Sequence, residues 1–142
     1  MKIMTKLATG LALLAVTMMF AGCAKNPEPT VRQRAQAYTQ LLVDEKFDEA
    51  VNFFDPDVVA RRGRTAVANS FKLVVGVVKG LNQFGKRKPA GFEIRKVDFD
   101  TEKTRATLQL VLFTTNTSGG DRKETPFDQK WVLRKDIWYA TE

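Results

Sequence analysis

The spacing of apolar residues changes once along this chain, near Pro89, and this change constrains the fold more than any other feature. Before it, apolar side chains recur every three to four residues, as they do on one face of a helix. The pattern predicts a helix that starts at about residue 31 with Thr30 as its N-cap, a second helical piece over residues 47–54, and a third helix over about residues 64–84. Asp55-Pro56-Asp57 is predicted to end the second piece.

After this point apolar and polar residues alternate, which is typical of strands with one buried face. Strands are predicted over residues 92–99, 105–115, 127–134 and 137–141, with a bulge near Arg95 and Lys96 where the alternation slips. Helices followed by an antiparallel meander predict an α+β fold, with N-terminal helices packed on one face of a curved antiparallel sheet. Residues 31–142 have an ordinary length for one domain.

Residues 1–22 are predicted to be a signal peptide. Lys2 and Lys6 make the start positive, residues 7–20 are almost wholly apolar, and small residues precede Cys23. The apolar run is shorter than the roughly 20 residues that a membrane-spanning helix needs. A cleaved secretory signal is therefore predicted in place of a permanent transmembrane helix.

The segment Phe20-Ala21-Gly22-Cys23 resembles the lipobox of bacterial lipoproteins, although Phe20 stands where Leu is usual. The resemblance implies that Cys23, the only cysteine, receives acyl chains such as palmitate and anchors the protein to a membrane. Because Ala24 follows, it also implies the outer membrane, facing the periplasm, if the source is Gram-negative. Residues 23–30 contain two prolines and are predicted to be a short extended tether.

The composition excludes several kinds of site. Without histidine and with one cysteine, the chain cannot form a Ser-His-Asp or Cys-His catalytic set, a histidine-ligated metal site or an internal disulfide. No cofactor and no metal are predicted. The formal net charge of +7 favours anionic partners. Secretion argues against nucleic acid, so an envelope surface is the expected anion.

Basic residues cluster on both sides of the third predicted helix and are candidate contacts to anionic headgroups or polymers. They are Arg61, Arg62 and Arg64 before the helix, and Lys86, Arg87 and Lys88 after it. A helix of this length spans about 30 Å, so the clusters are expected at opposite ends. An ordinary solvated surface is the alternative interpretation.

An acidic segment imitates the start of a calcium-binding loop, with Asp98, Asp100 and Glu102 at alternate positions. Such a loop needs Gly and Glu where this chain has Lys103 and Gln109. A solvated turn between two strands is therefore predicted.

Part of the chain resembles the nuclear transport factor 2-like (NTF2-like), or cystatin-like cone, superfamily, and in particular small lipoproteins with this domain. The resemblance rests on the helix with Tyr38 and Leu42, on residues 46–50, and on the ending at residues 130–139, where a tight turn joins two strands rich in aromatic residues. It implies a pocket between sheet and helices, with Tyr38 matching a recurring pocket tyrosine, and dimerisation through the sheet. Val111 and Phe113, on the otherwise polar face of their strand, are candidates for that interface.

Three functions follow from these features. The first is a non-enzymatic, membrane-anchored domain that binds a small apolar ligand or an envelope protein. The second is a structural lipoprotein that assembles through its sheet surface. The third is an isomerase- or dehydratase-like enzyme that uses Tyr38 with a carboxylate. Because the dehydratases of this superfamily depend on histidine and the acids here lie mainly in turns, we expect no catalysis.

Overall fold

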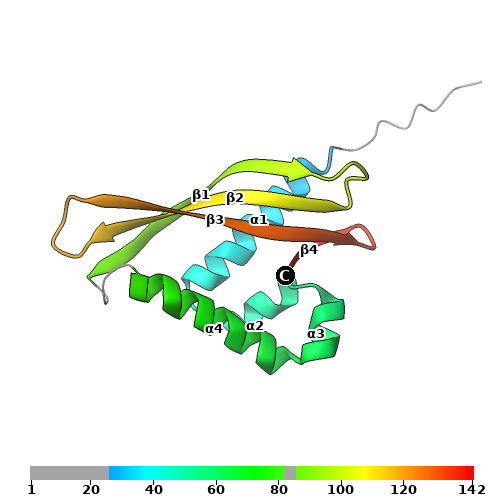
Figure 1. The fold of residues 1–142 in the computed structure, drawn as a ribbon, viewed down its shortest axis with the longest axis horizontal. Helices are drawn as coiled ribbons and strands as arrows, with labels where there is room; N and C mark the ends of the chain where they lie inside the picture. Colours follow the sequence, from blue (N-terminus) through cyan, green and yellow to red (C-terminus); the bar gives the residue numbers. More distant parts are fainter. Residues whose placement is uncertain (1–25, 82–85) are drawn as a thin grey trace, which may run out of the picture.

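The structure, a computed structural model, describes residues 26–81 and 86–142. In chain order its helices are α1 (Glu28–Val43), α2 (Phe47–Ala50), the 3-10 turn η1 (Val51–Phe53), α3 (Pro56–Arg62) and α4 (Arg64–Leu81). The strands are β1 (Arg87–Phe99), β2 (Arg105–Asn116), β3 (Arg122–Arg134) and β4 (Ile137–Thr141). They form one antiparallel sheet in the order β1-β2-β3-β4, with the helices on one of its faces (Figure 1). The predicted α+β architecture is confirmed, while the predicted signal peptide and Cys23 lie outside the described residues.

Helix α1 begins at Glu28, two residues before the predicted N-cap Thr30. Pro29 lies in the first turn, where its fixed φ suits a helix and its missing N–H is not needed. The Asn26 side-chain oxygen accepts the Glu28 N–H at 3.1 Å. The domain therefore starts inside the segment that was predicted to be a tether.

Helix α3 was not predicted, because Asp55-Pro56 was interpreted only as a stop signal. The Asp55 side chain accepts the Asp57 N–H and caps a new helix, with Pro56 at its first position. Gly63, with φ of 84°, ends α3 and lets the chain turn directly into α4. The same dipeptide therefore ends one helix and starts the next.

Strands β1 and β3 both begin about five residues earlier than the alternation predicts. Pro89 and Pro126 hid these early starts, because proline is rare inside strands. Both are tolerated here because one side of the strand is unpaired at each of them: β1 is an edge strand, and the short β4 does not reach Pro126 on β3. The predicted bulge is confirmed as a register shift between Ile94 and Lys96. The predicted turn at Lys135 and Asp136 is confirmed as well, with positive φ at both residues.

The hydrophobic core lies between the sheet, α1, α2 and the first half of α4. Its largest fully buried side chains are Trp131, Trp138, Leu108 and Leu110 from the sheet, and Val31, Val51 and Val67 from the helices. Tyr38 packs edge-on against Phe71 and Trp131, with ring centroids 5.8 and 5.7 Å apart. This end of the molecule is therefore filled.

The second half of α4 does not continue this packing. Val67 and Phe71 are buried, but Val75 and Val78 are half-buried and Val74 is 60% exposed. The helix packs mainly against α2 and α3 at its start, and the apolar stripe runs on beyond them. The apolar face of α4 beyond Phe71 is therefore only partly covered by the rest of the fold.

Candidate functional site

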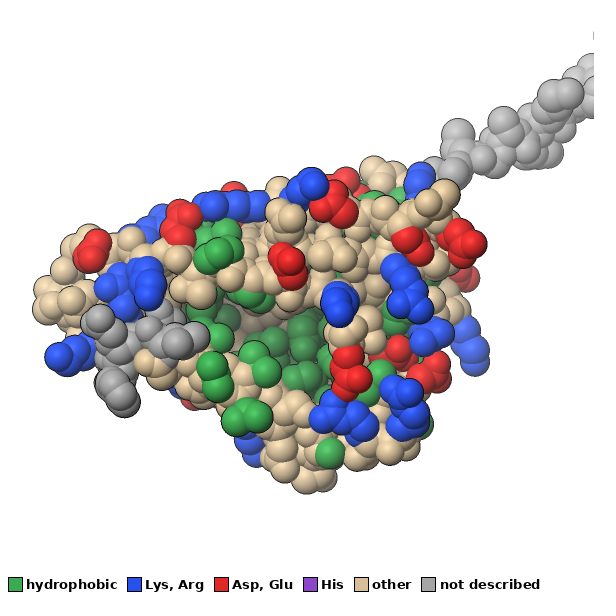
Figure 2. Space-filling model, in the orientation of Figure 1, with side chains coloured by type: hydrophobic (Ala, Val, Ile, Leu, Met, Phe, Trp, Pro, Cys, Tyr) green, Lys and Arg blue, Asp and Glu red, His purple; other side chains and the backbone are tan. Residues whose placement is uncertain are grey.

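A cavity of about 170 Å³ occupies the space between α1, the second half of α4 and the sheet. Its helical wall consists of Thr39, Leu42 and Val43 from α1 and Val74, Val75, Val78 and Lys79 from α4. Its sheet wall consists of Arg87, Pro89, Leu112, Thr114, Thr125 and Phe127. Figure 2 shows a hollow lined with hydrophobic side chains on the face where α4 runs below the sheet.

The cavity is large enough for a compact organic group. An engineered protein cavity of about 150 Å³ with apolar walls binds benzene. Leu73 and Val77, 70% and 54% exposed, lie on α4 beside the cavity residue Val74. The apolar surface therefore continues from the cavity onto the outside of the helix.

Two buried hydrogen bonds in series connect the core to the cavity wall. The Trp131 Nε1–H donates to Gln129 Oε1 at 3.2 Å, and Gln129 Nε2 donates to Thr39 Oγ1 at 2.9 Å. Gln129 and Thr39 are both buried, so these bonds satisfy groups that cannot reach water. They fix the Thr39 hydroxyl at the edge of the cavity.

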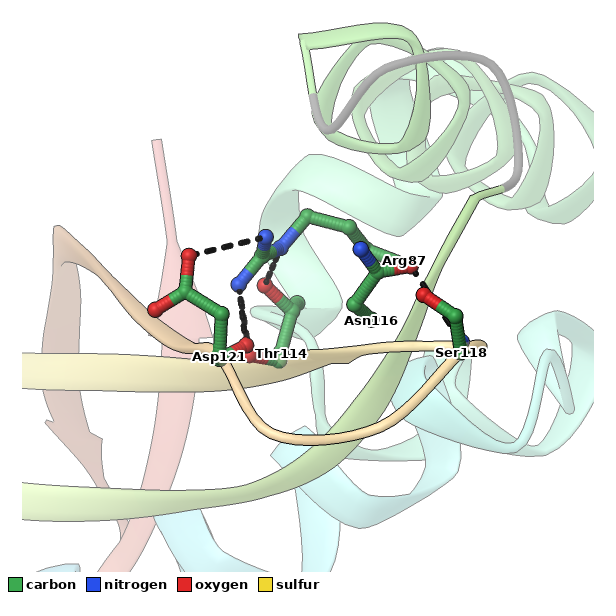
Figure 3. Close-up of polar contacts among 5 residues, drawn as sticks. All are labelled: Arg87, Thr114, Asn116, Ser118 and Asp121. Carbon is green, nitrogen blue, oxygen red and sulfur yellow. Dashed lines mark hydrogen bonds and ion pairs between the residues drawn. The ribbon is translucent and has the colours of Figure 1, made fainter.

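Arg87 is the most deeply placed charge in the cavity wall. Its side chain is 11% exposed, and Nε donates to Thr114 Oγ1 at 3.2 Å. Nη2 donates to the carbonyl oxygens of Thr114 and Asp121 at 3.3 and 2.6 Å (Figure 3). These contacts hold the guanidinium against the hairpin between β2 and β3.

The placement of Arg87 changes the prediction for the basic residues. Because this side chain is mostly buried, it does not belong to an exposed cluster with Lys86 and Lys88, which are exposed. Arg61, Arg62 and Arg64 lie at the other end of α4, whose 18 residues span about 27 Å. Arg62 pairs with Glu142, and Arg64 donates to the Asp48 carbonyl. The two clusters thus do not form one patch.

Tyr38, the residue singled out for a pocket, lies in the aromatic core and is not among the residues that line the cavity. Burial raises the pKa of its hydroxyl well above the ordinary value. Arg87, Thr114 and Thr125 were not predicted as cavity residues from the sequence. The sequence did contain one signal for the cavity: the apolar stripe of α4 continues through Val74, Val75 and Val78, beyond the part of the helix that packs on the core.

The outer face of the sheet carries charged side chains in place of the expected apolar patch. Val111 and Phe113 are 4% and 7% exposed, and the Arg122 guanidinium lies 3.6 Å from the Phe113 ring centroid. Arg95 pairs with Glu93 on its own strand and reaches across β2 to pair with Glu124 on β3. The two apolar residues therefore offer little surface to a partner, and dimerisation through the sheet stays a prediction.

The acidic segment forms the turn between β1 and β2. The Asp100 carboxylate accepts the Thr104 and Arg105 N–H groups at 2.8 and 3.0 Å. The Arg105 N–H, followed by the Thr104 contacts, lowers the pKa of Asp100. Asp98 pairs with Lys96 instead of turning toward Asp100. Within residues 26–81 and 86–142, no group of three or more His, Cys, Asp or Glu side chains is arranged to hold a metal.

In the described part of the chain, no helix combines the length and the apolar character needed to cross a membrane. No protein-family model matches the chain, and no curated protein sequence matches it significantly.

Several solved structures share the fold. A Campylobacter jejuni protein, provisionally described as an NTF2-like transpeptidase, superposes with a TM-score of 0.59 at 11% identity, over 79% of this chain and 97% of its own. A Catenulispora acidiphila protein gives 0.53 at 14% identity, over 80% and 86% of the two chains. A protein from a Streptomyces species gives 0.52 at 12% identity, over 82% and 88%. At these identities the likeness shows the fold alone, which is NTF2-like, as the resemblance implied.

Proposed function

We propose that this protein is a membrane-anchored, non-catalytic binding domain of the cell envelope, and that its cavity takes a small apolar ligand. The observation that carries the proposal is the apolar cavity between α1, α4 and the sheet. An apolar ligand that binds against these walls removes apolar surface from water, which is favourable.

The residues of the cavity wall favour binding over catalysis. Lys79 and Arg87 are its charged residues, and no Asp or Glu is among the described residues that line it. Proton abstraction of the isomerase kind needs a carboxylate base beside the substrate. Tyr38, the hydroxyl expected to assist such a base, packs in the core. These features support a site that holds a molecule without transforming it.

Ligand binding is tested with the neutral fluorophore N-phenyl-1-naphthylamine, which brightens in apolar surroundings. Two variants on α4 are matched, because both replace an exposed valine with tryptophan. Val74→Trp places its ring at the cavity, whereas Val77→Trp lies outside the lining. We expect Val74→Trp to weaken probe binding at least tenfold and Val77→Trp to leave it within twofold. Equal binding by the wild type and Val74→Trp would show that the probe does not occupy this cavity.

The location is the second part of the proposal, and the sequence before residue 24 supports it. An apolar run, two small residues and the only cysteine stand in the order that lipidation requires. A single acyl chain binds membranes only marginally, while two or more give stable anchoring. An acylated Cys23 would hold the domain at the membrane, because α1 begins only five residues later.

Anchoring is tested by comparing the wild type with Cys23→Ala after membrane fractionation and intact-mass measurement. We expect a wild-type mass that starts at residue 23 and includes acyl chains, and loss of membrane association in the variant. An unacylated wild-type protein in the soluble fraction would contradict the anchoring while leaving the cavity proposal intact.

A further inference from the structure

The charge of the cavity wall points to one class of ligand. Arg87 and Lys79 line the cavity, and none of the described residues of its wall is acidic. Lys79 is half exposed and pairs with Glu45 outside the wall. Arg87 is 11% exposed, so its positive charge is the one that a molecule inside the cavity would meet with least screening by water.

The charge on Arg87 is poorly compensated by the protein. Its Nε and Nη2 donate to neutral oxygens, namely the Thr114 hydroxyl and the carbonyls of Thr114 and Asp121. The acidic group that faces it is the Asp121 carboxylate, 4.0 Å from Nη1 and 88% exposed (Figure 3). A cation buried to this extent is costly unless a charged partner is close. An anion in the cavity would supply that partner.

A second polar group in the wall lacks a partner. The Thr125 Oγ1 atom is buried and makes no hydrogen bond among the described residues. Thr125 pairs with Leu112 across the sheet, and Thr114, which binds Arg87, lies two residues farther along β2 on the same face. Buried hydroxyls without a partner are uncommon, and each calls for an explanation. Oγ1 is shielded from the cavity in this rotamer, so a turn of the Thr125 side chain about χ1 would bring the hydroxyl to an acceptor on a ligand beside Thr114.

The rest of the wall is hydrocarbon. Val74, Val75 and Val78 face Leu112 and Phe127 across the cavity, and the exposed Leu73 and Val77 continue the apolar surface outside. A ligand that matches all of these features has a compact anionic group at one end and an alkyl group at the other. The cavity volume suits a short alkyl chain, and because the cavity is partly open to solvent, a longer chain has room to extend out of it.

We propose that the cavity binds a small anionic amphiphile, with its carboxylate-like head beside Arg87 and Thr125 and its alkyl chain against α4 and Leu112. This rests on the proposed ligand-binding function and adds the charge of the ligand to it. Arg87 Nη1 makes no hydrogen bond among the described residues, and the nearest carboxylate, that of the exposed Asp121, lies 4.0 Å away. A head-group oxygen in the cavity would therefore compete with Asp121 for this nitrogen.

The test compares octanoate with 1-octanol, which have the same number of carbons and differ in charge at neutral pH. Each displaces N-phenyl-1-naphthylamine from the purified protein. We expect octanoate to bind about tenfold more tightly than octanol, as one compensated charge implies. Arg87→Met should remove this preference while the neutral probe still binds. Thr125→Val should weaken octanoate several-fold without affecting octanol, and is expected to fold because it only removes an unpaired hydroxyl.

Thr107→Val is the matched control, because Thr107 lies on β2 outside the cavity lining. This substitution should leave the affinities for octanoate and for octanol unchanged. If octanoate and octanol bind equally, or if the preference for octanoate survives Arg87→Met, the proposal of an anionic head group is wrong. The proposed apolar binding site is then unaffected. Failure of the probe and both ligands to bind would instead overturn the proposed function itself. If phosphatidylglycerol vesicles displace the probe and octanoate does not, this face contacts membranes, and the proposal of a small amphiphilic ligand is wrong.

Discussion

Replacing Asp55 with alanine is expected to lower the free energy of unfolding by about 2–3 kcal/mol, because one carboxylate joins two distant parts of the chain. Its Oδ1 accepts the Asp57 N–H at 3.1 Å and caps α3. Its Oδ2 accepts a hydrogen bond from Arg134 on β3 at 3.1 Å. The Asp55 side chain is 4% exposed, so water cannot replace either bond.

The two contributions can be estimated separately. Loss of an N-cap costs about 0.5–2 kcal/mol. A hydrogen bond to a charged group contributes about 1.5–3 kcal/mol. The lower end applies to Arg134, because its side chain is 43% exposed and Asp57 remains as a second partner at 3.2 Å. Asp55→Asn keeps an oxygen for the cap and loses the charge, so we expect it to cost about half as much as Asp55→Ala.

Urea unfolding followed by circular dichroism measures these costs, provided that the slope with denaturant is unchanged. Asp57→Asn is the matched control. Its carboxylate contacts the same Arg134 but is 69% exposed, and we expect a cost below about 0.5 kcal/mol. If Asp55→Ala costs no more than this control, or if Asp55→Asn lowers the free energy of unfolding as much as Asp55→Ala, then the Asp55 carboxylate does not join α3 to β3 as described.

Other predictions concern the core, the cavity and the β1–β2 turn. Leu108→Ala, at a fully buried position, should cost about 2–5 kcal/mol in the same unfolding assay. Gln129→Leu should cost about 1–3 kcal/mol, since it leaves the buried Trp131 indole N–H without its acceptor. Affinity for 1-alkanols should rise about fourfold per added methylene until the chain outgrows the cavity, as probe displacement would show. Hydrogen bonds lower the Asp100 pKa below its ordinary value of 3.8, so this carboxylate stabilises the fold above that pH and the contribution is lost as pH falls through the lowered pKa. Unfolding of the wild type and Asp100→Ala at neutral and acidic pH should therefore converge in acid.

The sequence predicted those elements that simple periodicity specifies. Helix α1 and strand β2 each show one unbroken apolar face, and the slip near Lys96 marks a real bulge. Helix α3 was missed because seven residues hold too few apolar positions to show a period, and its start coincides with a stop signal. The early starts of β1 and β3 were missed because prolines are rare inside strands and are tolerated here only on unpaired edges.

The site was less predictable than the fold. An apolar stripe specifies which side of α4 faces inward, but not how far the helix stands from the sheet. Val74 looks like a core residue in the sequence and is 60% exposed in the structure. Arg87 looks like a surface residue because Lys86 and Lys88 flank it, yet the hairpin oxygens turn it inward. Both depend on contacts between residues far apart in sequence, which local patterns do not contain.

The bonds from Trp131 through Gln129 to Thr39 also give the protein a spectroscopic reporter of its own cavity. The chain has two tryptophans, and both are buried, so its intrinsic emission is expected to be blue-shifted. Trp131 is linked to the cavity wall by these bonds, while Trp138 packs against Phe99. In a Trp138→Phe background, a molecule that enters the cavity and disturbs Thr39 would change the polarity sensed by one indole. Occupancy could then be followed by light alone, with no label attached.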